Sequence, residues 1–182
     1  MKVCVLSSGS KGNSTLVITD KVKILIDLGT TTSYVEAALN NLNVDVKEIS
    51  HILITHSHAD HIKGLKVFIK RYNPVILVTE DMKNVLEKEL GNFRYEYYED
   101  KKAIIGDLTV NVIKTSHDAE ESIGFVLTNN NSSMVYITDT GYINQKYFKI
   151  LSNNNLYVLE SNHDIKMLMD GPYPYYLQQR VR

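Results

Sequence analysis

Three histidines and one aspartate, all side chains able to bind a metal ion, fall within six consecutive residues: His56, His58, Asp60 and His61. Held together, such groups repel one another or stay solvated unless a cation organises them. The apolar run at 52–55 predicts a buried strand before them, and the apolar spacing across 62–72 predicts an amphipathic helix after them. The sequence therefore predicts a metal site at a strand-to-helix corner.

The spacing suggests how the four groups divide between ions. His56 and His58, two residues apart, can bind one ion from a non-helical turn, while Asp60 and His61 can turn toward a second position at the start of the helix. Imidazole and carboxylate ligands suit zinc, manganese or iron, and without thiolates the site is not a typical structural zinc site. Two such ions would hold a bridging hydroxide and bind a phosphoryl or acyl oxygen. The alternative, a solvated polar loop, leaves the clustering unexplained.

The composition of the chain limits what kind of protein carries this site. The 182 residues suit a single domain, 1–182, with an ordinary apolar fraction and a net charge of −1, so bulk charge does not point to nucleic acid. The single cysteine, Cys4, is expected to be buried, and it cannot form an internal disulfide, which fits the reducing cytoplasm. The chain enters a strand at once, so no signal peptide is expected. No apolar run approaches the ~20 residues needed to span a bilayer.

Strands and helices are expected to mix throughout the chain. The expected strands are 3–6, 15–19, 22–27, 75–79, an alternating segment over 108–112, 125–128, 134–138 and 156–159. Ser33 with Glu36 predicts a capping box that opens a helix, and Gly91 is placed to end another that begins near Met82. The pattern predicts an α/β or α+β sandwich. Residues 175–182 are typical of a helix that has begun and not ended.

A resemblance sharpens this prediction. Residues 55–61, Thr-His-Ser-His-Ala-Asp-His, resemble the signature of the metallo-β-lactamase superfamily, whose members are hydrolases with an αββα sandwich. Residues 7–15, 138–142, 160–164 and 171–174 are together similar to the WalJ/YycJ group of that superfamily. That group is bacterial, resembles the RNase Z and RNase J nucleases in its metal site, and is associated with 5′-to-3′ exonuclease activity on DNA.

The resemblance implies a ligand set for two divalent ions, zinc or manganese and possibly iron. His56, His58 and His117 would bind the first ion, Asp60 and His61 the second, and Asp139 would bridge them. Taken alone, His117 is an ordinary strand-end histidine and Asp139 a capping aspartate. Asp60 would also orient the attacking hydroxide, and His163 would act as a distal acid on the leaving oxygen.

The sequence departs from the family at the second ion. The superfamily completes that position with one more histidine, which in the resembling group lies in a Gly-His-Leu-Ser-Asn-like stretch after the 175–182 helix. The chain is therefore expected to lack the closing elements of the fold and to hold an incomplete second metal site. His163 is the unassigned histidine after Asp139, and the competing interpretation places it in the first turn of a helix. Glu160 ends an apolar strand and would orient a proton donor.

Other candidates carry weaker signals. The loop 7–14, rich in glycine and hydroxyl groups, is either a phosphate cradle or simply a turn. Tyr95, Tyr97 and Tyr98 are placed either to stack on bases or to pack in an alternating strand. His51 has no motif around it and is expected to be structural or exposed.

The preferred hypothesis is a metal-dependent phosphodiesterase that uses a metal-bound hydroxide on nucleic acid, with DNA favoured as the partner. The first alternative is a thioesterase of the glyoxalase II kind or a lactonase, because one fold hosts many chemistries. The second is a truncated domain that binds metal without catalysis. The sequence does not distinguish zinc from manganese, DNA from RNA, exonuclease from endonuclease, or one oligomeric state from another.

Overall fold

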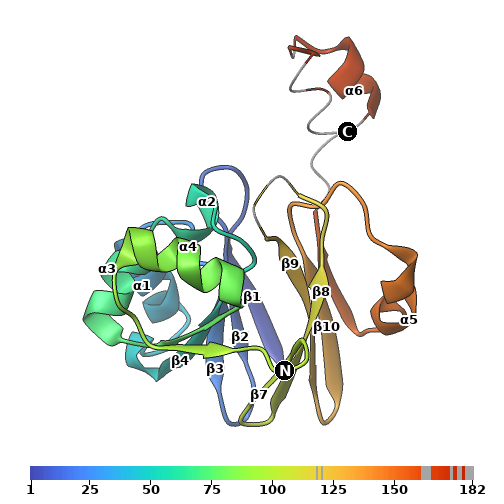
Figure 1. Ribbon diagram of the computed structural model, residues 1–182. Helices are drawn as coiled ribbons and strands as arrows, with labels where there is room; N and C mark the ends of the chain where they lie inside the picture. The colour runs from blue at the N-terminus through green and yellow to red at the C-terminus, as the bar shows by residue number, and fades with distance from the viewer. Residues whose placement is uncertain (118, 120, 161–164, 173, 176–177, 179–182) are drawn as a thin grey trace.

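Two β-sheets face each other, and helices cover their outer sides (Figure 1). The computed structural model describes residues 1–117, 119, 121–160, 165–172, 174–175 and 178. This arrangement is the predicted αββα sandwich.

The first sheet has six strands in chain order: β1 (Lys2–Ser7), β2 (Ser14–Ile18), β3 (Lys23–Ile26), β4 (Ile49–Leu53), β5 (Val75–Val78) and β6 (Tyr95–Tyr97). The first three strands pair antiparallel, and β3 through β6 pair parallel. The inner parallel strands β3 and β5 are almost continuously buried, as expected when both faces of a sheet are covered, whereas the edge strand β6 is exposed.

The second sheet has five strands in the order β11 (Leu156–Leu159), β10 (Ser132–Ile137), β9 (Ile123–Asn129), β8 (Leu108–Lys114) and β7 (Lys102–Ile105). Strands β7 to β10 pair antiparallel, and β11 joins β10 in parallel. The predicted hairpin between β9 and β10 is confirmed.

The helices are α1 (Thr32–Asn41), α2 (Ala59–Ile62), α3 (Leu65–Tyr72), α4 (Glu80–Leu90), α5 (Phe148–Leu151) and α6 (Ile165–Asp170), with 3₁₀ turns η1 (Val46–Glu48) and η2 (Gln145–Tyr147). Gly91 ends α4 as predicted.

Two helix predictions are wrong in detail. The N-cap of α1 is Thr31, whose side chain accepts from the Tyr34 amide, so Ser33 lies inside the helix and forms no capping box with Glu36. The Glu36 carboxylate instead accepts hydrogen bonds from Arg71 and Tyr72. The single helix expected over 62–72 is split into α2 and α3.

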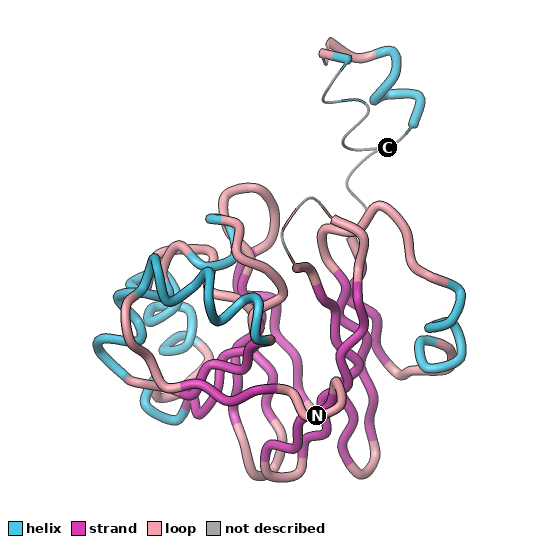
Figure 2. Tube along the Cα trace, viewed as in Figure 1, coloured by secondary structure: helices cyan, strands magenta, loops and turns pink. Residues whose placement is uncertain are grey.

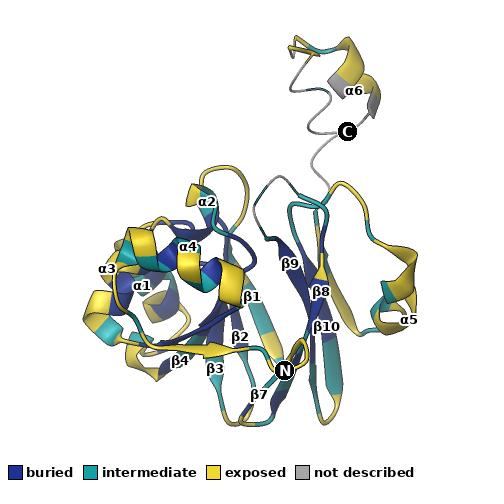
Figure 3. Ribbon diagram, viewed as in Figure 1, coloured by how far each residue is buried: buried dark blue, intermediate teal, exposed yellow. Residues whose placement is uncertain are grey.

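The space between the sheets is filled by one apolar cluster. Side chains from both sheets contribute, including Ile24 and Leu53 from the first and Val110 and Phe125 from the second. Most residues of the central strands, such as β2, β3, β9 and β10, are accordingly buried (Figure 3). A smaller cluster around Ile113 lies on the outer side of the second sheet. Burial of this apolar surface is the main favourable term that holds the two sheets together.

The functional residues gather where strands end. The loop between β1 and β2, helix α2 and the end of β8 lie at the same edge of the sandwich, uppermost in Figures 1 and 2. Ligand sites of sheets with parallel strands form at the carboxyl ends of those strands. Across the described part of the chain, no helix is both long enough and apolar enough to cross a membrane.

This edge depends on close backbone contact at Gly29. A Cβ added there would lie 1.6 Å from the Asp60 carbonyl oxygen and 2.7 Å from the Asn13 amide nitrogen. The same backbone groups hydrogen-bond, since Asn13 N donates to Asp60 O at 2.8 Å and Gly29 N donates to Asn13 O at 2.8 Å. Only glycine therefore fits between the loop after β3 and helix α2.

We expect Gly29→Ala to lower the free energy of unfolding by about 3 kcal/mol, because two backbone segments must separate to admit the methyl group. Urea denaturation followed by circular dichroism measures the change. Gly141→Ala is the control, because its Cβ would meet its nearest neighbour at 3.8 Å and should change stability little. Equal stability of the two variants would contradict the close contact.

Candidate metal centre

The six predicted metal ligands converge from four elements. His56 follows β4, His58 is the N-cap of α2, and His117 follows β8. Asp60 and His61 lie in α2, and Asp139 follows β10: the fold brings both halves of the chain to one point.

Three histidines form the first cluster. One ring nitrogen from each of His56, His58 and His117 lies within 4.8 Å of the others. Nε2 of His117 is 3.2 Å from Nδ1 of His58, and the His56 ring centroid is 4.7 Å from that of His58. This is the trio that the resemblance implies for the first ion.

A second cluster contains His56, His61 and Asp139, again with one ligand atom from each within 4.8 Å of the others. His61 Nε2 lies 3.0 Å from the Asp139 carboxylate. Neither cluster found among the described residues includes Asp60, whose carboxylate lies 3.7 Å from His61 Nε2. His56 thus belongs to both groups, and Asp60 lies beside the second.

The sequence prediction missed a residue that underlies this site, Asp27. Its fully buried carboxylate lies 2.8 Å from His61 Nδ1 and accepts 2.8 Å hydrogen bonds from the Thr55 amide and hydroxyl. An imidazole that donates one nitrogen to a carboxylate presents its other nitrogen in a fixed orientation, which is the usual support of a metal-binding histidine. Asp27 therefore orients His61 Nε2 toward Asp139.

A signal for Asp27 does exist in the sequence. Asp27-Leu28-Gly29 follows an apolar strand, as does Asp139-Thr140-Gly141. Both aspartates adopt the left-handed backbone region, with φ of 59° and 51°. Residues held in this region outside glycine concentrate at functional sites. The repeated Asp-X-Gly at two strand ends marks both carboxylates of the centre.

The two buried histidines of the second cluster differ in charge. Burial and the neighbouring His61 lower the pKa of His56 to about 2, so His56 is neutral at physiological pH. Burial also disfavours charge on His61, but the carboxylates of Asp27 and Asp139 outweigh it and raise the pKa of His61 to about 10. With Nδ1 directed to Asp27, the extra proton lies on Nε2, between the imidazole and Asp139. A positive charge is thus required at that point.

The donor set fits a metal ion. His56 Nε2 is buried and is without a hydrogen-bond partner among the described residues, while His56 Nδ1 lies 3.1 Å from the Thr55 hydroxyl. An orphaned buried nitrogen is costly unless something binds it. A neutral imidazole nitrogen facing other imidazoles and a carboxylate matches the ligands that zinc, manganese and iron accept.

Two further polar residues lie at the centre. Asn13, from the predicted glycine- and hydroxyl-rich loop, has its amide nitrogen 3.1 Å from His61 Nε2, and its side-chain oxygen accepts a 3.0 Å hydrogen bond from the Gly9 amide. Glu160 accepts a 2.7 Å hydrogen bond from the Thr140 amide, next to Asp139. Glu160 therefore holds the turn that carries Asp139, and its orientation of a proton donor stays a prediction.

The remaining candidates lie elsewhere. His163, predicted as a distal acid, is outside the described residues. His51 is half-buried within β4, where Nδ1 lies 2.9 Å from the Ser50 hydroxyl, in agreement with a structural role. Tyr95 and Tyr97 are exposed on β6, and Tyr98 packs near Phe125.

The profile of the metallo-β-lactamase superfamily matches residues 8–166. The chain belongs to the metallo-β-lactamase superfamily. It is 36% identical over 181 residues to the exodeoxyribonuclease YycJ of Bacillus anthracis, covering 97% of this chain and 69% of that relative. It is 32% identical over 186 residues to the exodeoxyribonuclease WalJ of Streptococcus pneumoniae, covering 99% and 69%. The predicted resemblance is confirmed.

Solved metallo-β-lactamase-fold structures agree with the architecture. The fold protein YhfI of Bacillus subtilis superposes with a TM-score of 0.69 at 18% identity, over 88% of this chain and 70% of that chain. The metallo-β-lactamase GOB-18 of Elizabethkingia meningoseptica superposes with a TM-score of 0.64 at 19% identity, over 93% and 78%. These likenesses confirm the superfamily fold, and family membership supports the prediction of a metal-dependent hydrolase.

We expect Asp27→Asn to weaken binding of zinc or manganese by about 10–100-fold, because the amide no longer fixes the histidine as a carboxylate does. Competition with a chromophoric chelator measures the affinity. Asp107→Asn is the control, since Asp107 is bonded to Thr19 away from the clusters. Unchanged affinity in Asp27→Asn would contradict the orienting role.

Metal binding should also release the proton of His61, whose pKa in the metal-free protein is raised to about 10. Below that pH the proton competes with the ion for Nε2, so apparent affinity should rise about tenfold per pH unit as the pH increases. Calorimetry of zinc binding in two buffers of different ionisation enthalpy counts the protons released at pH 7.5. A pH-independent affinity without proton release would contradict this assignment.

Proposed function

We propose that this chain is a metal-dependent phosphodiesterase that digests DNA from its 5′ end. The observation that carries the proposal is the pair of adjacent ligand clusters that share His56. The relatives named exodeoxyribonuclease, similar over nearly the whole chain, support DNA as the substrate. The single cysteine, which fits a reducing compartment, supports action in the cytoplasm.

In this proposal the six predicted ligands hold two divalent ions. His56, His58 and His117 would hold one ion, Asp60 and His61 would hold the other, and Asp139 would serve both. Divalent ions held by these residues would stabilise negative charge on phosphoryl oxygens and lower the pKa of bound water. Zinc, manganese and iron all fit these donors.

The chain's own residues prepare this chemistry. Asp27 fixes His61, and Glu160 fixes the turn of Asp139, so the ligands are oriented before substrate binds. The Asp60 side chain is 31% exposed, and its carboxylate would accept a hydrogen bond from the attacking water and orient it toward phosphorus. His163 is proposed to donate a proton to the leaving oxygen.

Purified protein supplied with manganese or zinc should digest 5′-labelled single-stranded DNA, and chelation should abolish the activity. His58→Ala should lower kcat/KM by about 100-fold or more, because a ligand of the first cluster is lost. His51→Ala is the matched control: it changes a histidine of neighbouring β4 that is outside both clusters and should retain activity.

The same assay addresses the two alternatives. Hydrolysis of thioesters or lactones, with no digestion of DNA, would replace the nuclease with a thioesterase or lactonase of the same fold. About one ion per chain by elemental analysis, with no hydrolysis of any substrate, would support the inactive metal-binding domain. The incomplete second metal position and the single truncated domain, 1–182, stay predictions that this stoichiometry and the gene sequence test.

A further inference from the structure

A pocket of about 300 Å³ opens directly beside the first cluster. Its wall includes His117 together with Ser116 at the end of β8, and Tyr142 and Lys146 from the segment after β10. Because His117 is both a cluster member and a wall residue, anything in this pocket lies next to the proposed ions.

The pocket wall is fixed to the metal centre by hydrogen bonds. Gly141 N donates to Ser116 O at 2.8 Å, and Ser116 N donates to the Thr140 hydroxyl at 3.3 Å. Lys114 N donates to the Tyr147 hydroxyl at 3.2 Å. The segment that carries Asp139 therefore continues into the pocket and is tied to the strand that carries His117.

The lining has the chemistry of a nucleotide site. Lys114 and Lys146 supply two positive charges, and no carboxylate lies among the described residues of the lining. The Lys146 ammonium lies 4.9 Å from the centre of the Tyr147 ring, so its position is supported by an aromatic face. Tyr142 is 66% exposed and offers a ring to a planar partner. Cations with an aromatic ring are the elements by which proteins bind single strands.

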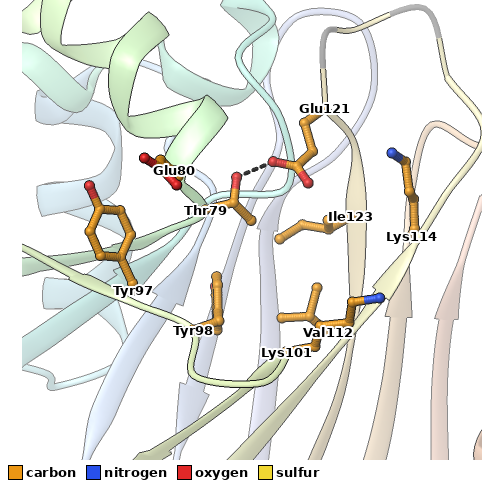
Figure 4. Close-up of a pocket in the computed structure, with 9 residues that line it drawn as sticks. All are labelled: Thr79, Glu80, Tyr97, Tyr98, Lys101, Val112, Lys114, Glu121 and Ile123. Atoms are coloured by element: carbon orange, nitrogen blue, oxygen red, sulfur yellow. Dashed lines mark hydrogen bonds between the residues drawn. The ribbon is translucent and has the colours of Figure 1, made fainter.

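A second pocket, of about 500 Å³, also has Lys114 in its lining but differs in its other charged residues (Figure 4). There Lys101 and Lys114 share the lining with the carboxylates of Glu80 and Glu121. Thr79 donates a hydrogen bond to Glu121. The carboxylates offset the lysines and repel a phosphate chain, so this pocket suits DNA less well.

We propose that the pocket beside His117, lined by Lys114, Tyr142 and Lys146, holds the nucleotide that flanks the scissile phosphate of single-stranded DNA. Lys146 contacts the backbone phosphate, and Tyr142 stacks on the base. The assignment rests on the proposed nuclease function and specifies where that function binds its substrate.

Binding and hydrolysis are measured separately to test it. Binding uses fluorescence anisotropy with a labelled, phosphorothioate-linked oligothymidylate that resists digestion. Hydrolysis uses single-stranded DNA and a small bis-aryl phosphodiester, which has neither a nucleobase to stack on Tyr142 nor a second phosphate to contact Lys146. Tyr142→Ala and Lys146→Ala are compared with Tyr97→Ala and Lys101→Ala, matched changes in the carboxylate-lined pocket.

We expect Tyr142→Ala and Lys146→Ala each to raise the Kd for oligothymidylate about tenfold, with hydrolysis of the small phosphodiester within about twofold of wild type. Tyr142→Phe should restore binding, since the ring is kept. Lys146→Ala should also reduce the slope of log Kd against log salt by about 0.7, because one phosphate contact is lost. Both control variants should bind as wild type does.

Unchanged oligothymidylate binding in Tyr142→Ala and Lys146→Ala would overturn the pocket assignment while leaving the nuclease proposal in place. Weaker binding in Tyr97→Ala and Lys101→Ala instead would place the strand in the other pocket and overturn it as well. If the wild-type protein hydrolysed neither substrate, while oligothymidylate binding still depended on Tyr142 and Lys146, the nuclease proposal alone would be overturned.

Discussion

The buried carboxylate of Asp27 is the interaction on which the centre depends. It links the end of β3 to the end of β4 through Thr55, and to helix α2 through His61. A buried carboxylate is tolerated only when several donors satisfy it, and here three do. The same contacts that compensate the buried charge therefore fix the direction of a metal-binding imidazole. The contacts that stabilise this edge of the fold and those that organise the candidate site are thus the same.

The charge of the Asp27 carboxylate also affects the protonation of His61. Asp27 and Asp139 lie on opposite nitrogens of His61, and two negative charges around one imidazole demand a positive charge between them. In the metal-free protein the charge is a proton, and the pKa of His61 is raised accordingly. Neighbouring His56 stays neutral, because burial and His61 both disfavour its charged form. In the metal-free protein the neutral His56 could therefore bind an ion directly, whereas His61 would first have to lose a proton.

Much of this site could be predicted from sequence because its signal is local. The His56–His61 stretch needs no knowledge of the fold, since its residue types and spacing alone indicate a metal. Asp139 was accepted only through the resemblance, and Asp27, with the same Asp-X-Gly pattern, was missed. A lone aspartate after a strand cannot be distinguished from an ordinary capping residue until the residues that it contacts elsewhere in the chain are known.

The errors in the helices have the same origin. The apolar spacing over 62–72 is continuous, yet a Cβ at Gly64 would lie 2.2 Å from the Thr30 carbonyl oxygen, where the chain breaks into α2 and α3. Glu36 fits a capping box by spacing, but it bonds Arg71 and Tyr72, 35 and 36 residues away in sequence. In both cases contacts between residues far apart in the chain determine the helix boundaries, and such contacts cannot be read from the local sequence pattern.

His56 makes the two proposed metal positions unequal. It belongs to both clusters, yet Thr55 lies against its Nδ1, which leaves Nε2 as the single nitrogen to share. One lone pair serves one ion at a time. In the proposed assignment that nitrogen belongs to the first position, so the second position would depend on His61, Asp139 and the neighbouring Asp60. We therefore expect the first position to bind its ion more tightly and to fill before the second.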